Sequence, residues 1–189
     1  MNHRDKWINI IYKVATSSGK VRSLLTPLSS ILFFTLEALY IVLALRIDEI
    51  LGLPKLFSTP FNLIVSVPFL AMGLFLTVWS ILHFVRAKGT PMPFNPPPNL
   101  VTTGPYAHVR NPIVAGGAIS LIGLGILFGS VSLVFAFAPL IILLNVLELM
   151  AIEEPELEKR LGRQYLEYKK TVPMFVPLAG CRRTMKSRF

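Results

Sequence analysis

The sequence of 189 residues is poor in charge and nearly free of cysteine. Charged residues make up 15% of it, against roughly 25% in an average soluble domain, while 53% of its residues are hydrophobic. One cysteine, Cys181, cannot form an internal disulfide, and the widely spaced His3, His83 and His108 offer no zinc-binding spacing. The composition therefore excludes a disulfide scaffold and a structural metal site, and it argues against a soluble domain.

Three long uncharged runs indicate a membrane protein. Residues 28–45 contain a single acid, and residues 61–85 and 113–147 contain no formal charge. As one helix the last run would be about 52 Å long, too long for a hydrocarbon core of about 30 Å, so it must fold back, at Gly129 and Ser130. We expect an all-α integral membrane protein of about four transmembrane helices, the last two forming a C-terminal helical hairpin.

The distribution of basic residues predicts the orientation. The net charge of +9 suits either nucleic acid or anionic lipid, and the hydropathy decides for the membrane, so no nucleic-acid partner is expected. Of the 19 Lys and Arg residues, 17 flank the predicted spans on one side, which places both termini in the cytoplasm. Three segments follow: a basic N-terminal segment (1–27), two transmembrane helices (28–85), and a core (86–189) of loop, hairpin, cytoplasmic amphipathic helix and basic tail.

The first arm of the predicted hairpin is rich in small residues. Gly116 and Ser120 are four residues apart, as are Gly125 and Gly129. Small residues at this spacing let helix backbones approach closely in lipid, although glycine is also common in membrane helices generally. The arm is expected to make a close helix contact, and it is a candidate surface for a homo-oligomer.

Polar residues flank the hairpin at its cytoplasmic mouth. A proline-rich stretch, residues 91–98, cannot be helical and forms a stiff spacer or lid. Residues 99–112 lead into the hairpin and Glu153 and Glu154 leave it, so folding back should bring Arg110 beside Glu153. Such a pocket would be apolar below and charged above. Alternatively, Arg110 anchors the membrane helix and the glutamates begin the amphipathic helix expected at 156–169.

Ionisable groups within the predicted spans are functional candidates by default. Glu37 lies in the middle of the first span, and Asn145 and Glu148 share one side of the last helix. Glu148 or His83 could accept a proton from a substrate, although a histidine at the position of His83 is more typical of a helix interface.

Two ordered motifs carry a resemblance to a known family. The segments 100–112 and 153–173, with the hairpin between them, resemble the membrane methyltransferases related to isoprenylcysteine carboxyl methyltransferase and the phospholipid methyltransferases. The resemblance implies that S-adenosylmethionine binds at the hairpin mouth and that the substrate is a lipid or lipid-soluble small molecule. The residues implied at the cofactor are Asn99, Tyr106, Ala107, His108, Val109, Arg110, Asn111, Pro112, Ile119, Ser120, Glu153 and Glu154. Those expected to act on the acceptor are Glu148, Asn145 and Arg110.

The chain departs from the family pattern at three positions. The family usually has Arg-His-Pro-x-Tyr, where this chain has Asn111 for the histidine and Val114 for the tyrosine; Leu149 replaces an arginine that serves the substrate in the carboxyl methyltransferases. Without that arginine a buried substrate carboxylate would lack a counter-charge, which favours an uncharged amine or thiol as acceptor. An NADPH-dependent sterol-type reductase and a catalytically inactive membrane scaffold are the alternatives. The reductases are expected to carry an Asp and a Lys-Cys pattern in place of Glu153 and Glu154.

Overall fold

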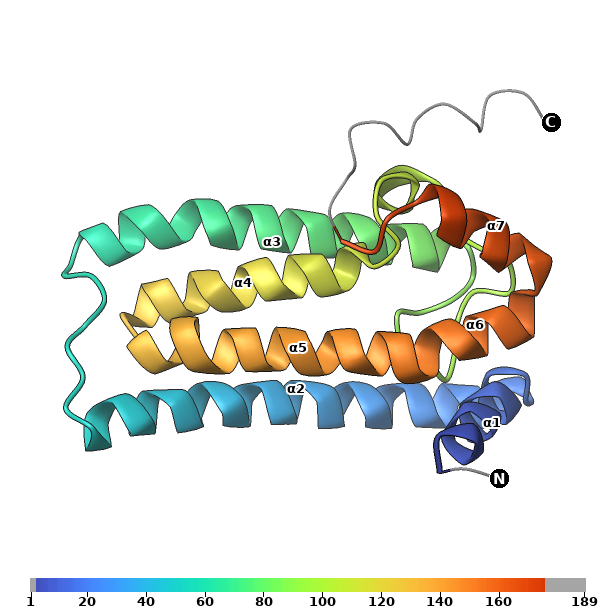
Figure 1. Ribbon diagram of the computed structural model, residues 1–189, viewed down its shortest axis with the longest axis horizontal. Coiled ribbons are helices and arrows are strands. Elements are labelled where there is room, and N and C mark those ends of the chain that lie inside the picture. The colour runs from blue at the N-terminus through green and yellow to red at the C-terminus, as the bar shows by residue number, and fades with distance from the viewer. Residues whose placement is uncertain (1–2, 176–189) are drawn as a thin grey trace.

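The computed structural model describes residues 3–175, and every regular element in that range is a helix (Figure 1). The α-helices are α1 (His3–Ala15), α2 (Gly19–Ile50), α3 (Phe61–Arg86), α4 (Pro112–Phe128), α5 (Ala138–Glu148), α6 (Glu154–Leu161) and α7 (Arg163–Thr171). A 3-10 turn, η1 (Gly104–Ala107), precedes α4, and two π-helical turns, η2 (Leu133–Phe137) and η3 (Leu149–Glu153), precede α5 and α6. The prediction of an all-α membrane protein is confirmed. The basic tail expected after residue 177 lies outside the described residues.

Among the described residues, three helical stretches are long and apolar enough to cross a bilayer. They are α2, α3 and the continuous stretch Leu133–Leu161, and α4 is a shorter apolar helix beside them. The predicted fold-back is also present, because α4 ends at Phe128 and Gly129 adopts a left-handed conformation with φ of 67°. Figure 1 shows α1, the loop before α4 and helices α6 and α7 at the same end of the bundle.

Two predicted helix boundaries were wrong. The last hairpin helix runs to Leu161, where an end near Glu154 was expected, while the first apolar helix begins at Gly19 and contains the predicted run from Leu28. Proline usually ends a helix, because it lacks an N–H and crowds the preceding turn. Here the wide turn η3 ends just before Pro155 and lets the helix continue past it. The helix expected at 156–169 is instead divided into α6 and α7 at Gly162, whose φ is 58°.

Helices α3 and α4 pack through glycines. A β-carbon at Gly73 would lie 2.7 Å from the carbonyl oxygen of Gly116, and one at Gly123 would lie 2.9 Å from Leu70. The small residues therefore serve a contact within the chain, as small residues do where helix backbones approach in lipid. Gly117 lies on the open side of α4, where a β-carbon would meet no atom of the described residues within 4 Å.

Replacement of Gly73 by alanine is expected to destabilise the protein by about 1–3 kcal/mol, because the new methyl group overlaps the α4 backbone. Thermal unfolding in detergent micelles measures this as a lower Tm. Gly117→Ala is the matched control, since it adds a methyl group in open space. Equal Tm values for the two variants would show that the α3 and α4 backbones are not in close contact.

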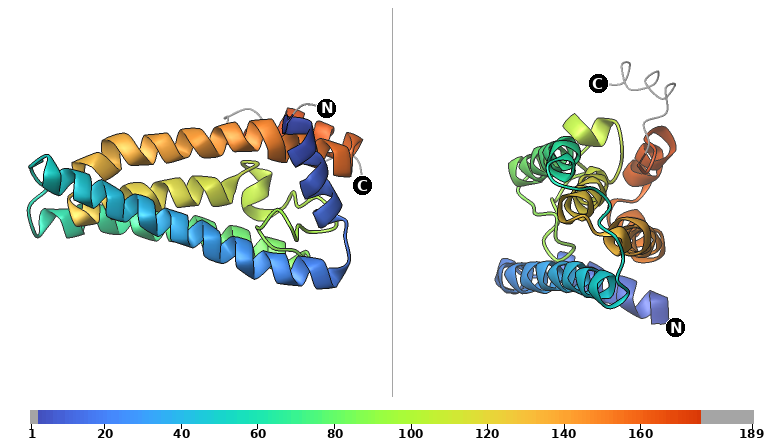
Figure 2. Two further views of the ribbon diagram at one scale, coloured as in Figure 1. Left: turned by 90° about the horizontal axis from the view of Figure 1, so that it is seen from below. Right: turned by 90° about the vertical axis from the view of Figure 1, so that its left-hand side faces the viewer.

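Helix α2 is attached to the bundle mainly at one end. Ala44 is fully buried against Leu133, Ala138 and Ile141, and Asp48 accepts hydrogen bonds from the Ser130 hydroxyl and from the Ser132 amide at 2.9 Å. Anions stabilise the start of a helix, so Asp48 fixes the start of the last long helix. Figure 2 shows α2 diverging from α5 away from this attachment, with α1 turning back toward α6.

Candidate active site

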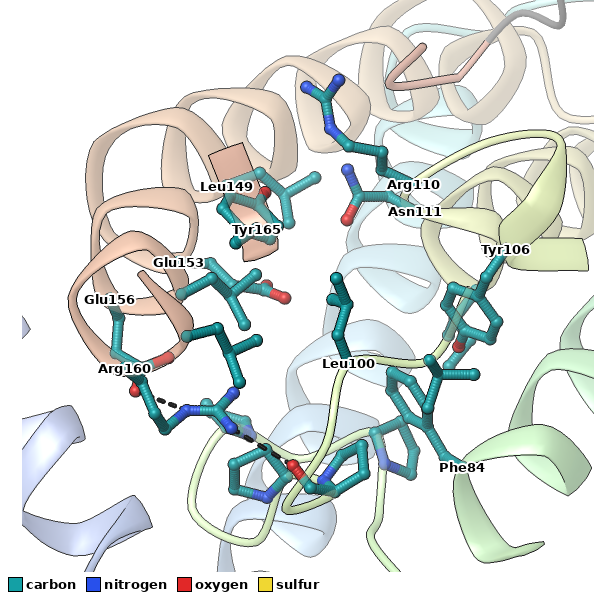
Figure 3. A pocket seen from close by; sticks show the side chains of 18 of the residues that line it. Phe84, Leu100, Tyr106, Arg110, Asn111, Leu149, Glu153, Glu156, Arg160 and Tyr165 are labelled. Atoms are coloured by element: carbon teal, nitrogen blue, oxygen red, sulfur yellow. Dashed lines mark hydrogen bonds and ion pairs between the residues drawn. The ribbon is translucent and has the colours of Figure 1, made fainter. Parts of the chain in front are cut away.

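A pocket lies at the mouth of the α4–α5 hairpin (Figure 3). Its walls come from η1 and the start of α4, from the stretch η3 to α7, and from the proline-rich loop; Ile11 of α1 and Phe84 of α3 complete them. The empty space measures about 1030 Å³, which includes the open mouth. Two segments that are about 40 residues apart in the sequence thus face each other across one cavity, as the fold-back predicts.

Tyr106 forms a fixed part of the wall on the η1 side. Its ring stacks on Phe84 with centroids 4.8 Å apart, and its carbonyl accepts a hydrogen bond of 2.7 Å from the Tyr168 hydroxyl. Burial, and then the nearby Tyr168 and Glu153, raises the pKa of the Tyr106 hydroxyl well above its ordinary value. Tyr106 therefore stays protonated and can donate a hydrogen bond.

Arg110 joins the two motifs through buried bonds to Glu154, Lys169 and Val172, which together form the Arg110 clamp. Its Nη2 lies 2.6 Å from Oε1 of Glu154, and its Nη1 donates to the carbonyls of Lys169 and Val172 at 3.0 and 2.6 Å. Lys169 Nζ pairs with the other Glu154 oxygen at 2.7 Å, and this hydrogen bond and one to Glu158 raise the pKa of Lys169. The expected neighbour of Arg110 was Glu153, whereas the ion pair is made with Glu154, which does not line the pocket.

Glu153, which does not pair with Arg110, lines the pocket. Its side chain points into the cavity (Figure 3), and it makes no hydrogen bond or ion pair with any residue in the part of the chain that the structure describes. Glu148, Glu154 and Glu156 surround it with negative charge, and Arg160 is the positive group that acts on it. The wide turn η3 begins at Leu149 and ends at Glu153, and both residues face the cavity. A carboxylate placed in this way is suited to bind a cation.

Three buried polar atoms on the opposite wall also lack partners among the described residues. They are Oη of Tyr106, Nε of Arg110 and Nδ2 of Asn111, and all three residues line the pocket. Buried polar groups in native proteins are nearly always hydrogen bonded, so such a group usually marks an absent ligand or water. The pocket is therefore lined on the η1 side by residues with unpartnered polar atoms and on the η3 side by a carboxylate.

The proline-rich loop covers the remaining side and is pinned to α6. Arg160 pairs with Glu156 at 2.9 Å and donates to the carbonyl of Pro97 at 3.2 Å. Within the loop, the Thr90 amide donates to the Asn95 carbonyl at 2.8 Å. The prediction that this stretch is not helical is confirmed, and its prolines form an apolar side of the cavity.

Comparison with protein families found a match to this chain. The family described as phospholipid methyltransferase matches residues 61–164, more than half of the chain. The chain belongs to this family. Comparison with curated proteins and comparison with solved structures each gave no match. The match spans α3 to α6 and thus contains the first motif and the beginning of the second, residues 153–164, while α1 and α2 precede it.

Half of the predicted site residues of this phospholipid methyltransferase family member line the pocket. Those that line it are Asn99, Tyr106, Arg110, Asn111, Pro112, Glu148 and Glu153. Those that do not line it are Ala107, His108, Val109, Ile119, Ser120 and Glu154, while Asn145 lines a neighbouring groove. Ser120 faces Gly73 of α3, because it lies two turns into α4.

The sequence reasoning missed several residues of the pocket. Glu156 and Arg160 form a buried ion pair, and Tyr165 and Tyr168 pack with Leu100 beneath the loop. The four-residue spacing of Glu156 and Arg160 was the available signal, since such pairs are neighbours on one helix face. His83, in contrast, is held by its Nδ1 hydrogen bond of 2.9 Å to the Trp79 carbonyl and does not line the pocket.

Proposed function

We propose that this chain transfers a methyl group from S-adenosylmethionine to an uncharged nucleophile on a lipid-soluble acceptor that arrives from the bilayer. The observation that carries this proposal is the lining of one pocket, in which the unpaired Glu153 carboxylate lies on one wall and three residues with unpartnered buried donors, Tyr106, Arg110 and Asn111, lie on the other. An amino acid carboxylate and ammonium need such opposed partners. The residues present therefore fit the amino acid part of this cofactor.

When bound, S-adenosylmethionine supplies an electrophilic methyl group on a sulfonium. Asn111 and the Nε of Arg110 would bind the carboxylate, because both donors are unpartnered within the described residues and charge-assisted hydrogen bonds are strong. Glu153 would bind the ammonium. The prolines of the loop, Leu149 and Leu157 would exclude water, which favours a displacement that depends on alignment of the two reactants.

Glu148 is the residue that we place beside the acceptor. It lines the pocket one residue before Leu149, which is 2% exposed and supplies no positive charge to a substrate carboxylate. An amine must lose a proton to become a nucleophile, and Glu148 is positioned to accept it, whereas His83 lies outside the pocket. Asn145 of the adjoining groove would orient the acceptor.

In the proposed topology the chain crosses the membrane four times, with both ends and the pocket on the cytoplasmic side. The short α4 would be the fourth crossing, since it is apolar and packs along α3 (Figure 1). In the sequence, 17 of the 19 basic residues belong to segments on one side of the predicted spans, which supports the orientation.

A transfer assay tests the function and the acceptor class together. Purified protein is expected to bind S-adenosylmethionine and not NADPH, and to methylate a long-chain amine or thiol but not a prenylcysteine carboxylate. Leu149→Arg is expected to raise turnover of the prenylcysteine at least tenfold over the unmodified protein, because it supplies the missing counter-charge. The measurement is radiolabelled methyl incorporation. Efficient methylation of the prenylcysteine without the mutation would refute the acceptor class, and no binding and no turnover would favour an inactive scaffold.

A further inference from the structure

A second cavity opens between α2 and α5, beside the pocket. Two stripes of residues face each other across it: Phe33, Leu36, Glu37 and Tyr40 from α2, and Ile141, Leu144, Asn145 and Glu148 from α5. Each stripe follows the three- and four-residue spacing of one helix face. The groove exists because α2 is held against the bundle at Ala44 and Asp48, while α1 at its other end contacts α6 and η3.

Glu148 connects this groove to the pocket, because it lines both cavities. Glu148 lies 18 residues after Ser130, about 27 Å along the helix, which places it near the cytoplasmic border of a hydrocarbon core about 30 Å thick. Glu37 lies deeper, on a helix that precedes the residues matched by the family. The groove therefore runs from the lipid to the wall of the pocket.

The groove carries polar groups that lipid does not satisfy. Glu37, Tyr40 and Glu148 make no hydrogen bond or ion pair within residues 3–175, and the Asn145 amide donates to the Ile141 carbonyl at 2.8 Å, which leaves its own oxygen free to accept. Polar side chains inside a membrane are costly and usually face a partner or a substrate path. Here they are predominantly acceptors, and the apolar side chains around them suit a hydrocarbon chain.

No Lys or Arg among the described residues lines the groove, and the two arginines of the adjoining pocket are already engaged. Arg110 is clamped to Glu154, and Arg160 is paired with Glu156. A phosphodiester is joined to the amine of an aminophospholipid by only two carbons, so it would lie beside Glu37 or Glu148 without a counter-charge. Placing an unpaired anion next to carboxylates is unfavourable.

Resting on the proposed function, we propose that this groove binds the acceptor, and that the acceptor is an amphiphile with an ammonium headgroup and no phosphate. Glu37 and Glu148 bind the ammonium, and the apolar stripes bind its chain. Glu37 is a specificity-determining residue because it supplies a carboxylate from a helix outside the matched family region. The chemistry of the groove thus differs from that expected for a phospholipid headgroup.

Photolabelling tests this site without any methyl transfer. The probe is a twelve-carbon alkylammonium with a diazirine at the end of its chain, added to the protein in phosphatidylcholine vesicles in the absence of cofactor. Labelled peptides are expected from α2 and α5. Dodecyltrimethylammonium, which cannot accept a methyl group, is expected to compete at least tenfold better than phosphatidylethanolamine or dodecanol at the same mole fraction.

Glu37→Gln is expected to reduce labelling at least fivefold, and Leu144→Trp, which fills the groove, should abolish it. Glu49→Gln is the matched control, because it removes a carboxylate from the same helix at an exposed pair with Arg46. Unchanged labelling in Glu37→Gln, or competition by phosphatidylethanolamine equal to that by dodecyltrimethylammonium, would overturn the proposal. Titration of the unmodified protein with S-adenosylmethionine separates the two hypotheses: labelling that depends on Glu37 in a protein that does not bind this cofactor supports the groove and refutes the methyl donor.

Discussion

Glu153→Gln is expected to weaken S-adenosylmethionine binding by tenfold or more, with little change in the fold. The unpaired carboxylate is the acidic group directed into the pocket from η3, and a charge-assisted hydrogen bond at such a site contributes about 1.5–3 kcal/mol. Glutamine has nearly the same shape, and Glu153 makes no hydrogen bond or ion pair with the described residues, so the Tm should change little. Isothermal titration and thermal unfolding on the same preparation measure both effects.

The combination of weaker binding and undiminished stability is what distinguishes a binding residue from a structural one. Glu167→Gln provides the control, since Glu167 is an exposed residue paired with Arg163 on α7. Equal cofactor affinity in Glu153→Gln and the unmodified protein would assign Glu153 to the packing of η3 alone.

Arg110→Met, unlike Glu153→Gln, is expected to act on stability and to destabilise the protein by about 3–5 kcal/mol. The Arg110 and Glu154 side chains are 9% and 7% exposed, and removal of the guanidinium leaves a buried carboxylate and two carbonyls without their main donor. Lys169 retains its bond to Glu154 and limits the loss. A large fall in Tm, with faster proteolysis of α6 and α7, is the expected result.

Two further variants separate the clamp from a simple effect of charge. Arg163→Met removes an arginine whose pair with Glu167 is exposed, and it should leave the Tm unchanged. Arg110→Met combined with Glu154→Leu should be more stable than Arg110→Met alone, because no uncompensated buried charge remains. If Arg110→Met unfolds at the same temperature as Arg163→Met, the clamp contributes nothing to stability.

The fold could be predicted from the sequence where one physical effect dominates. The absence of charge over 35 residues required a hairpin, and Gly129 supplied the left-handed turn. The meeting of the two polar segments followed from that geometry. The helix ends were harder to predict, because a proline such as Pro155 normally ends a helix, whereas the wide turn η3 allowed this one to continue.

The pairing within the site could not be predicted from spacing alone. Glu153 and Glu154 are adjacent, and a helix directs adjacent residues about 100° apart, so only the position of α7 decides which of them meets Arg110. Lys169 and the carbonyl of Val172 are on that side, and they select Glu154. The attachment of α2 by Asp48 was missed for the same reason, since its partner Ser132 is 84 residues away.

The position of Glu148 on both cavities has a consequence for how the two ligands are supplied. On the proposed arrangement the cofactor comes from water and the acceptor from the bilayer, so their concentrations are counted in different phases. The effective concentration of the acceptor is its mole fraction among the lipids. Inert phospholipid therefore dilutes the acceptor even when its amount per litre is unchanged. Saturation by the acceptor is therefore a property of membrane composition, whereas saturation by the cofactor is a property of the aqueous solution.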